Sequence, residues 1–190
     1  GANVFGGAIY CGWGYLTGKR RSSDEWKWGV DNYRDIAAYA QRNSSLILGI
    51  EPLNRFESHF INVARDAVAF IQEVGMPNVK VHLDTFHMIR EEDDMVQAVL
   101  DTGGYLGYVH ACENQRGIPG TGLVPWTSVF QALRQVRYDG CVTIESFDPA
   151  IESVAKLCCI WRKLADSPEQ LATEGLRFLK GVHEDVYGPL

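Results

Sequence analysis

The sequence predicts a parallel α/β barrel, of which this chain contains about five β-α units. Short apolar segments typical of buried parallel strands alternate with segments of helical periodicity. Four of the apolar segments end in a side chain able to bind a metal ion, and successive ends are roughly thirty residues apart, the length of one βαβ step. The four residues are Glu51, Asp84, His110 and Glu145.

The first third of the chain predicts two strands joined by a long loop and a helix. Val4–Tyr10 is a short apolar segment that contains glycine, and we expect a strand there. Cys11–Trp28 is rich in glycine and aromatic residues, which predicts a loop. Asp24 is a suitable cap for a helix over Glu25–Arg42, and the continuous apolar run Leu46–Glu51 predicts a second, buried strand.

The middle of the chain repeats this order twice. Asn62–Val74 carries apolar residues on one helical face, and Gly75–Asn78 predicts a turn. Val79–Asp84 predicts the third strand. The acidic residues that begin Glu91–Leu100 are favourable at a helix N-terminus, so a helix is expected there, followed by a fourth strand over Leu106–His110.

The last third predicts one more strand and three helices. Ala111–Leu123 is a polar loop rich in glycine, and Pro125–Val136 is an amphipathic helix that opens with proline. Cys141–Glu145 is the fifth strand. Helices are expected over Ile151–Trp161 and from Pro168 to about His183.

Four chemical groups at successive strand ends favour a closed barrel over an open sheet, because barrel enzymes place their chemistry at the carboxyl ends of the strands. A complete eight-unit barrel takes about 250 residues, and this chain has 190. We therefore interpret residues 1–190 as one barrel domain that lacks the first three β-α units, which would be absent from the polypeptide or supplied by another chain.

The composition limits the classes of partner that this chain could bind and the cellular compartment in which it would occur. The net charge is −6, which gives no electrostatic footprint for nucleic acid or an anionic membrane. No apolar run is long enough to span a bilayer, and the first residues lack the basic region of a signal peptide. The five cysteines include no Cys-x-x-Cys pair, so we expect reduced thiols in a cytoplasmic protein.

The four groups at the strand ends predict a site for one divalent metal. Three carboxylates and one imidazole suit Mn²⁺, Mg²⁺ or Co²⁺ better than a metal that prefers thiolates. A single acid would be interpreted as a surface group, but repetition at four strand ends favours the metal. Because side chains alternate along a strand, His82 is expected one layer below Asp84, as a core histidine or a partner of a ligand.

Such a metal can polarise a carbonyl and stabilise an enediolate, so that a carboxylate can remove the proton on the neighbouring carbon. Glu51 and Glu145 lie on well-separated strands and could address opposite faces of one carbon. Two bases on opposite faces would give epimerisation. One base moving a proton between adjacent carbons would give aldose–ketose isomerisation.

Several linked motifs resemble the ketose 3-epimerases, which act on D-tagatose, D-psicose and L-ribulose within the xylose isomerase-like TIM barrels. The resemblance covers about residues 7–178. The motifs are Glu51-Pro-Leu-Asn-Arg-Phe-Glu57, Leu83-Asp-Thr-Phe-His-Met88, Val109-His-Ala-Cys-Glu-Asn-Gln-Arg116, Tyr138-Asp-Gly140, Ile144-Glu-Ser-Phe147 and Ile160-Trp-Arg162. The chain departs from the family at Ile89-Arg90, where an asparagine often follows the His-Met pair, and this change could alter which sugar fits beyond C3.

The resemblance implies a metal, typically Mn²⁺, on the four groups at the strand ends, with Glu51 and Glu145 as the acid–base pair. It also implies a homo-oligomer, a dimer or a tetramer, that acts on a small-molecule ketose. The residues implied to bind the sugar are Glu57, His87, Arg116 and Trp13. Loop packing by Trp13 is an equally good interpretation, and Glu57 could instead pair with Arg55.

Other functions remain open at this point. A hydroxypyruvate isomerase, an aldose–ketose isomerase or an inosose dehydratase would use the same barrel and the same pair of glutamates. A metal-binding fragment without turnover belongs to a different class. A metal nuclease would need more histidines and a basic groove than this acidic chain offers.

Overall fold

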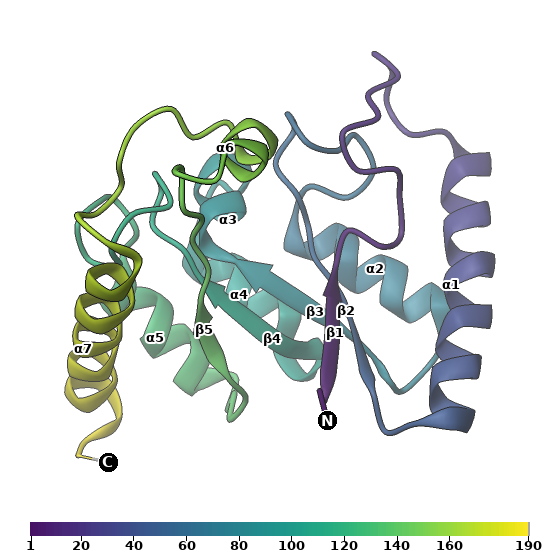
Figure 1. Ribbon diagram of the computed structural model, residues 1–190. Coiled ribbons are helices and arrows are strands. Elements are labelled where there is room, and N and C mark those ends of the chain that lie inside the picture. Colours follow the sequence, from purple (N-terminus) through teal and green to yellow (C-terminus); the bar gives the residue numbers. More distant parts are fainter. Residues whose placement is uncertain (190) are drawn as a thin grey trace.

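A computed structural model describes residues 1–189 of the chain. Five parallel strands form one sheet in which each strand pairs with the next along the sequence. Figure 1 shows them fanning apart, the curvature of a barrel segment. The strands are β1 (Val4–Gly7), β2 (Ile47–Ile50), β3 (Val79–Asp84), β4 (Leu106–Ala111) and β5 (Val142–Ile144).

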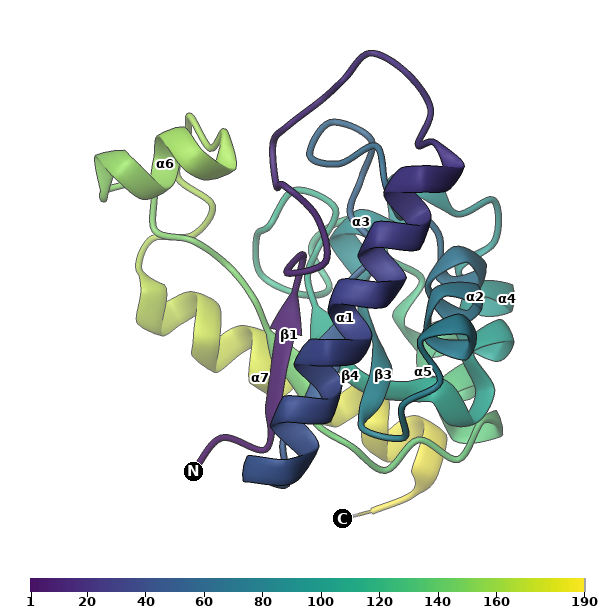
Figure 2. The same ribbon diagram turned by 90° about the vertical axis from the view of Figure 1, so that its right-hand side faces the viewer.

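Within residues 1–189, seven helices and a short 3-10 turn connect or follow these strands. Helices α1, α2, α4 and α5 cover one face of the sheet, and α6 and α7 follow β5 (Figures 1 and 2). The helices are α1 (Ser23–Asn43), α2 (Ala64–Val74), α3 (Thr85–Glu91), α4 (Met95–Thr102), α5 (Trp126–Gln135), α6 (Glu152–Cys158) and α7 (Pro168–Tyr187), and the turn is η1 (Gly103–Tyr105).

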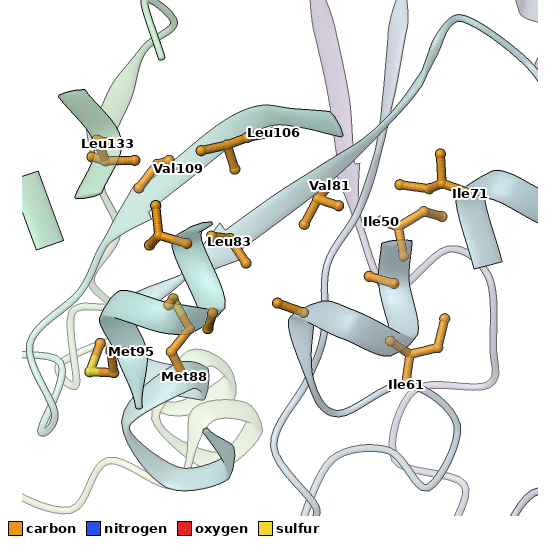
Figure 3. Packing of buried hydrophobic residues seen from close by; sticks show 14 of the residues in the cluster. Ile50, Ile61, Ile71, Val81, Leu83, Met88, Met95, Leu106, Val109 and Leu133 are labelled. Carbon is orange, nitrogen blue, oxygen red and sulfur yellow. The ribbon is translucent and has the colours of Figure 1, made fainter. Parts of the chain in front are cut away.

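The hydrophobic core lies between the sheet and the helices that cover it. Figure 3 shows Ile50, Val81, Leu83 and Val109 of the strands beside aliphatic residues of the helices. Val81 and Leu83 are almost completely buried. Because side chains alternate along a strand, packing these apolar residues against the helices sends Asp84 to the opposite, inner face of the curved sheet.

The first helix begins two residues before the predicted position. Ser22, not Asp24, is its cap: the Ser22 hydroxyl accepts from the backbone N–H of Glu25, and the Glu25 carboxylate accepts from the backbone N–H of Ser22. This reciprocal capping box satisfies two backbone donors, which a cap at Asp24 would leave without partners.

The helix predicted over residues 91–100 is present from Met95 onward, but its predicted start is wrong. Two shorter helices occupy this region: α3 starts directly after β3, and α4 starts at Met95. Asp84 caps α3 through Phe86, and Asp94 caps α4 through the N–H groups of Val96 and Gln97. The acidic run therefore divides two helices instead of opening one, because Asp94 is the acid that caps the backbone.

Two glycines make room for a buried imidazole on the inner face of the sheet. A Cβ atom on Gly6 would lie 2.7 Å from His82 Nδ1, and one on Gly49 would lie 3.0 Å from the Cβ of His82. His82 is nearly inaccessible and packs edge-on against Tyr108 and His110. The inner layer therefore requires glycine at both positions.

None of the helices within residues 1–189 combines the length and the hydropathy that a membrane-spanning segment needs.

Candidate metal centre and its surroundings

The four predicted metal ligands lie at the same end of the sheet. Glu51 directly follows β2, Asp84 is the last residue of β3, His110 lies one residue before the end of β4, and Glu145 directly follows β5. In the strand ladder Asp84 pairs with His110. The parallel direction of all the strands therefore brings the four groups together.

The imidazole of His110 is the point at which the carboxylates converge. Its Nδ1 atom lies 3.7 Å from Glu51 Oε1, 3.9 Å from Asp84 Oδ2 and 3.5 Å from Glu145 Oε1. This nitrogen is buried and has no hydrogen-bond partner among the described residues. An unpaired buried nitrogen surrounded by three carboxylates is a donor set suited to a cation.

The spacing also suits one shared ion. Metal–ligand distances of about 2.0–2.2 Å allow two ligands of one ion to lie up to roughly 4.4 Å apart. The three distances from His110 Nδ1 are below that limit. Asp84, His110 and Glu145 form one compact group of possible ligands. Glu51 belongs to two other such groups, one of which shares Asp84 with the first group and the other His110.

A competing group, formed by Glu51, Asp84 and His87, is less suited to a metal. The backbone N–H of Asn54 donates to His87 Nδ1 at 3.0 Å, so that nitrogen is an acceptor. In a neutral imidazole the proton then resides on Nε2, which lies about 4 Å from Glu51 and Asp84. Burial, followed by Arg116, lowers the pKa of His87 to about 2. His87 therefore presents an N–H donor to the centre.

A third group contains His82 with Glu51 and His110. Nδ1 of His82 lies 3.8 Å from Glu51 Oε2, and neither ring nitrogen has a hydrogen-bond partner among residues 1–189. Burial, followed by the neighbouring His110, lowers the pKa of His82 to about 3. The ring is therefore a neutral neighbour of the centre, one layer deeper in the sheet.

The three carboxylates have different electrostatic surroundings. Burial raises the pKa of Glu51, and burial raises that of Asp84 to about 7 against the opposing effect of Arg116. Burial acts in the same direction on Glu145, but Arg116 and then His110 outweigh it and lower the pKa of this residue overall. The surroundings therefore raise the pKa of Glu51 and lower the pKa of Glu145.

Arg116 reaches the centre from the loop between β4 and α5. Its Nη1 atom lies 3.0 Å from Asp84 Oδ2 and also forms an ion pair with Glu145. Its guanidinium stacks on the ring of Phe86, and its backbone has a left-handed φ of 65°. Such a conformation is uncommon for a residue other than glycine, and here it directs a buried positive charge toward the carboxylates.

Glu57 and Trp13 contact each other at the rim. The indole N–H of Trp13 donates to Glu57 Oε2 at 3.0 Å, and the side-chain amide of Asn54 donates to Glu57 Oε1 at 2.8 Å. Arg55 pairs with Glu91 and not with Glu57. Trp13 remains half-exposed, so its indole ring is available at the rim. The sugar-binding roles of these residues stay predictions.

Two residues that sequence reasoning did not place also touch the site. The buried thiol of Cys112 lies 3.5 Å from Asp84 Oδ2 and 3.0 Å from Arg116 Nη1. Asn54 contacts both His87 and Glu57. Their closeness to the predicted site residues in sequence was the available signal, but an asparagine or a cysteine has many other roles in a loop.

Comparison with known proteins identifies the family. Residues 2–182 match the family described as xylose isomerase-like TIM barrel. The chain belongs to this family. Membership confirms the predicted barrel class, and the five parallel strands are a part of such a barrel.

Ketose 3-epimerases are among the curated proteins that are similar to this chain. The chain is 37% identical over 182 residues to an L-ribulose 3-epimerase of Methylomonas sp. (strain DH-1), covering 95% of the chain and 63% of that protein. It is 34% identical over 191 residues to a D-psicose 3-epimerase of Ruminiclostridium cellulolyticum, covering 96% and 65%. The chain thus spans less than two thirds of the length of either relative.

Solved structures give the same result. A structure of L-ribulose 3-epimerase superposes with a TM-score of 0.93 at 33% identity, covering 98% of this chain and 63% of the other. The resemblance to ketose 3-epimerases, first seen in the motifs, is confirmed by both the sequences and the structures of these relatives.

Proposed function

We propose that this xylose isomerase-like barrel is part of a metal-dependent ketose 3-epimerase, an isomerase that inverts the configuration at C3 of a free ketose. The observation that carries the proposal is the position of His110 Nδ1, buried without a hydrogen-bond partner and within 3.9 Å of an oxygen atom of Glu51, Asp84 and Glu145. The relatives named as ketose 3-epimerases support the reaction class.

The proposed ligands are Glu51, Asp84, His110 and Glu145, and the proposed metal is Mn²⁺, with Mg²⁺ or Co²⁺ as substitutes. Oxygen ligands with one imidazole suit these ions. A divalent ion held there would polarise the ketose carbonyl and stabilise the negative charge that develops when the proton on C3 is removed.

The chain's own part in the reaction is the proton transfer. Glu51 and Glu145 follow strands β2 and β5, which are separated in the sheet by β3 and β4. We propose that one carboxylate removes the C3 proton and that the other delivers a proton to the opposite face of the carbon. The opposite effects of their surroundings on the two pKa values are consistent with different proton affinities.

Four further residues are proposed to hold the sugar. The Nε2–H of His87 and the guanidinium of Arg116 are donors beside the carboxylates. Glu57 retains acceptor capacity at the rim, and Trp13 beside it would form an apolar wall. Donors deep in the site and an aromatic wall at its rim would bind a polyhydroxylated chain by hydrogen bonds and packing.

We also propose how this chain is completed into a barrel, in which compartment it occurs and how it assembles. The edge strands β1 and β5 each pair with one strand only among the described residues, which supports one barrel domain whose first three β-α units lie outside this chain. The protein is proposed to be a cytoplasmic homo-oligomer, a dimer or a tetramer, whose partner molecule is the sugar.

The proposal is tested on purified, metal-free protein. Mn²⁺ is titrated and counted per chain, and D-psicose, D-tagatose and L-ribulose are then incubated in deuterated water while NMR follows the hydrogen on C3. We expect one metal ion per chain and metal-dependent loss of the C3 signal together with formation of the epimer. Metal binding without exchange would favour an inert metal-binding protein, and exchange with a different product would favour an isomerase or a dehydratase.

A further inference from the structure

His82 is an imidazole buried beneath the candidate metal centre, and neither of its ring nitrogens has a hydrogen-bond partner among residues 1–189. Only 2% of the residue is exposed. A polar group that is buried without a partner loses its hydration without compensation, so such groups are rare in folded proteins. An apolar side chain in this layer would avoid that loss. The imidazole therefore requires an explanation other than packing.

The two oxygens of the Glu51 carboxylate face different histidines. Oε1 lies 3.7 Å from His110 Nδ1 and 4.0 Å from His87 Nε2. Oε2 lies 3.8 Å from Nδ1 of His82. The first oxygen is therefore turned toward the proposed metal position, and the second is turned toward the deeper layer of the sheet.

The position of the His82 ring is fixed by its neighbours. The ring projects from β3 and packs edge-on against the rings of Tyr108 and His110 on β4. The backbone of β1 lies against the same ring, because a Cβ atom on Gly6 would come within 2.7 Å of Nδ1. These contacts leave the ring little freedom, so Nδ1 is held on the side of Glu51.

The contact with Glu51 also determines which nitrogen of His82 carries the proton. A neutral imidazole has one N–H and one acceptor nitrogen, and an ionised carboxylate only accepts. With the proton on Nε2, the lone pair of Nδ1 would face the carboxylate and repel it. With the proton on Nδ1, the same contact is attractive, and a hydrogen bond from an N–H to a carboxylate is among the stronger ones in proteins.

We infer that His82 is a positioning residue for Glu51, donating from its Nδ1–H to Oε2 so that Oε1 stays turned toward the metal position. The separation of 3.8 Å is too long for a hydrogen bond, but hydrogen bonds in catalytic sites are often long before a ligand binds and shorten afterwards. A carboxylate oxygen has two acceptor sites, so Oε2 keeps one for proton transfer. The inference rests on the proposed function, in which Glu51 binds the metal and moves a proton.

Two variants of similar size separate this role from packing. Asparagine carries an N–H donor at the δ position, as His82 does at Nδ1, whereas leucine has a similar shape and no donor. Because burial favours the apolar side chain, His82→Leu should unfold at a higher temperature than His82→Asn. Mn²⁺ affinity should follow the opposite order. A role in packing alone would give the same order in both measurements.

Calorimetry with Mn²⁺ measures the affinity. Residues that orient a metal ligand typically contribute 10–100-fold to metal affinity, so His82→Leu should bind Mn²⁺ about tenfold or more weakly, and His82→Asn should recover most of that loss. Tyr108→Phe is the control from the same layer. It removes a hydroxyl that contacts Thr143, and its Mn²⁺ affinity should equal that of the unmodified protein.

A second measurement depends neither on turnover nor on the folding of a variant. Long-range ¹H–¹⁵N NMR of the unmodified protein with Mg²⁺, which is diamagnetic, should show the proton of His82 on Nδ1. The signal is assigned as the one that His82→Asn lacks. A proton on Nε2 would overturn the inference, because Nδ1 could not then donate to Glu51.

The outcomes distinguish this inference from the proposed function. Equal Mn²⁺ affinities for the leucine and asparagine variants would overturn the role of His82 and leave the epimerase proposal standing. Mn²⁺ binding that depends on the donor at this position, without exchange at C3 of D-psicose, would support the role of His82 and overturn the epimerase proposal. A failure of the unmodified protein to bind Mn²⁺ would overturn both.

Discussion

The backbone N–H of Asn54 donates a hydrogen bond to Nδ1 of His87 across 33 residues of sequence, at 3.0 Å. A backbone N–H can only donate, so this contact assigns the ring tautomer. The loop after β2 thereby determines what α3 presents to the metal centre, namely an N–H group on Nε2.

His87 should remain neutral from pH 5 to pH 8. Burial and the nearby Arg116 lower its pKa to about 2, so Nδ1 accepts and Nε2 carries the proton throughout. Long-range ¹H–¹⁵N NMR of the imidazole should show the Nε2–H tautomer unchanged from pH 5 to pH 8. A ring that titrates in this range, or one protonated on Nδ1, would contradict the assignment and the donor role proposed for His87.

Replacing Glu145 with glutamine should abolish exchange at C3. A positioned general base contributes about 10²–10⁴-fold to the rate, and an amide cannot accept the proton. The fold should persist, because Glu145 lies beyond β5 and is partly exposed. NMR in deuterated water measures the exchange, and circular dichroism measures the fold. Exchange at the unmodified rate would remove Glu145 from the mechanism.

Alanine in place of Gly49 should destabilise the protein by about 1–3 kcal/mol, the range for overpacking a core. The added Cβ would lie 3.0 Å from the Cβ of His82 and 3.2 Å from the Cα of Gly6, and neither position can move freely. Thermal unfolding measures the effect. Gly181→Ala on α7 is the control: its Cβ meets nothing within 4 Å, so helix propensity alone should raise stability by up to about 1 kcal/mol.

Glutamine in place of Glu113 should destabilise the loop that carries Arg116. Oε2 of this fully buried carboxylate accepts from Gly120 N and Trp126 Nε1, and Oε1 accepts from Val124 N. Whichever carboxylate oxygen the amide NH₂ replaces, it would face an N–H donor. The buried group left without a hydrogen bond would lower the free energy of unfolding by about 1–3 kcal/mol.

The midpoint of urea unfolding measures this change. Glu184→Gln on the exposed face of α7 removes the same charge and should stay within about 0.5 kcal/mol of the unmodified protein. Equal midpoints for the two variants would show that Glu113 has no special role in holding the loop.

The strands, the end of the sheet that carries the candidate site, and the family could be predicted from the sequence alone. Apolar runs such as residues 46–51, each ending in a charged side chain, predicted the parallel strands and the end of the sheet at which chemistry would occur. These predictions were possible because side chains alternate between the two faces of a strand, so neighbouring residues in the sequence determine which side chains share a face. The motifs around Glu51, Asp84, His110 and Glu145 were enough to suggest the family that the comparisons confirm.

Other features depended on contacts between distant segments. Capping by Ser22 and Asp94 was missed because several neighbouring polar residues could cap a helix, and backbone geometry selects one of them. The tautomer of His87 is set by a residue 33 positions away. Arg90 and Arg116 share one aromatic ring only once α3 and the loop after β4 have packed together. Sequence patterns are local, whereas the charge and hydrogen bonding of a site depend on which segments the fold brings into contact.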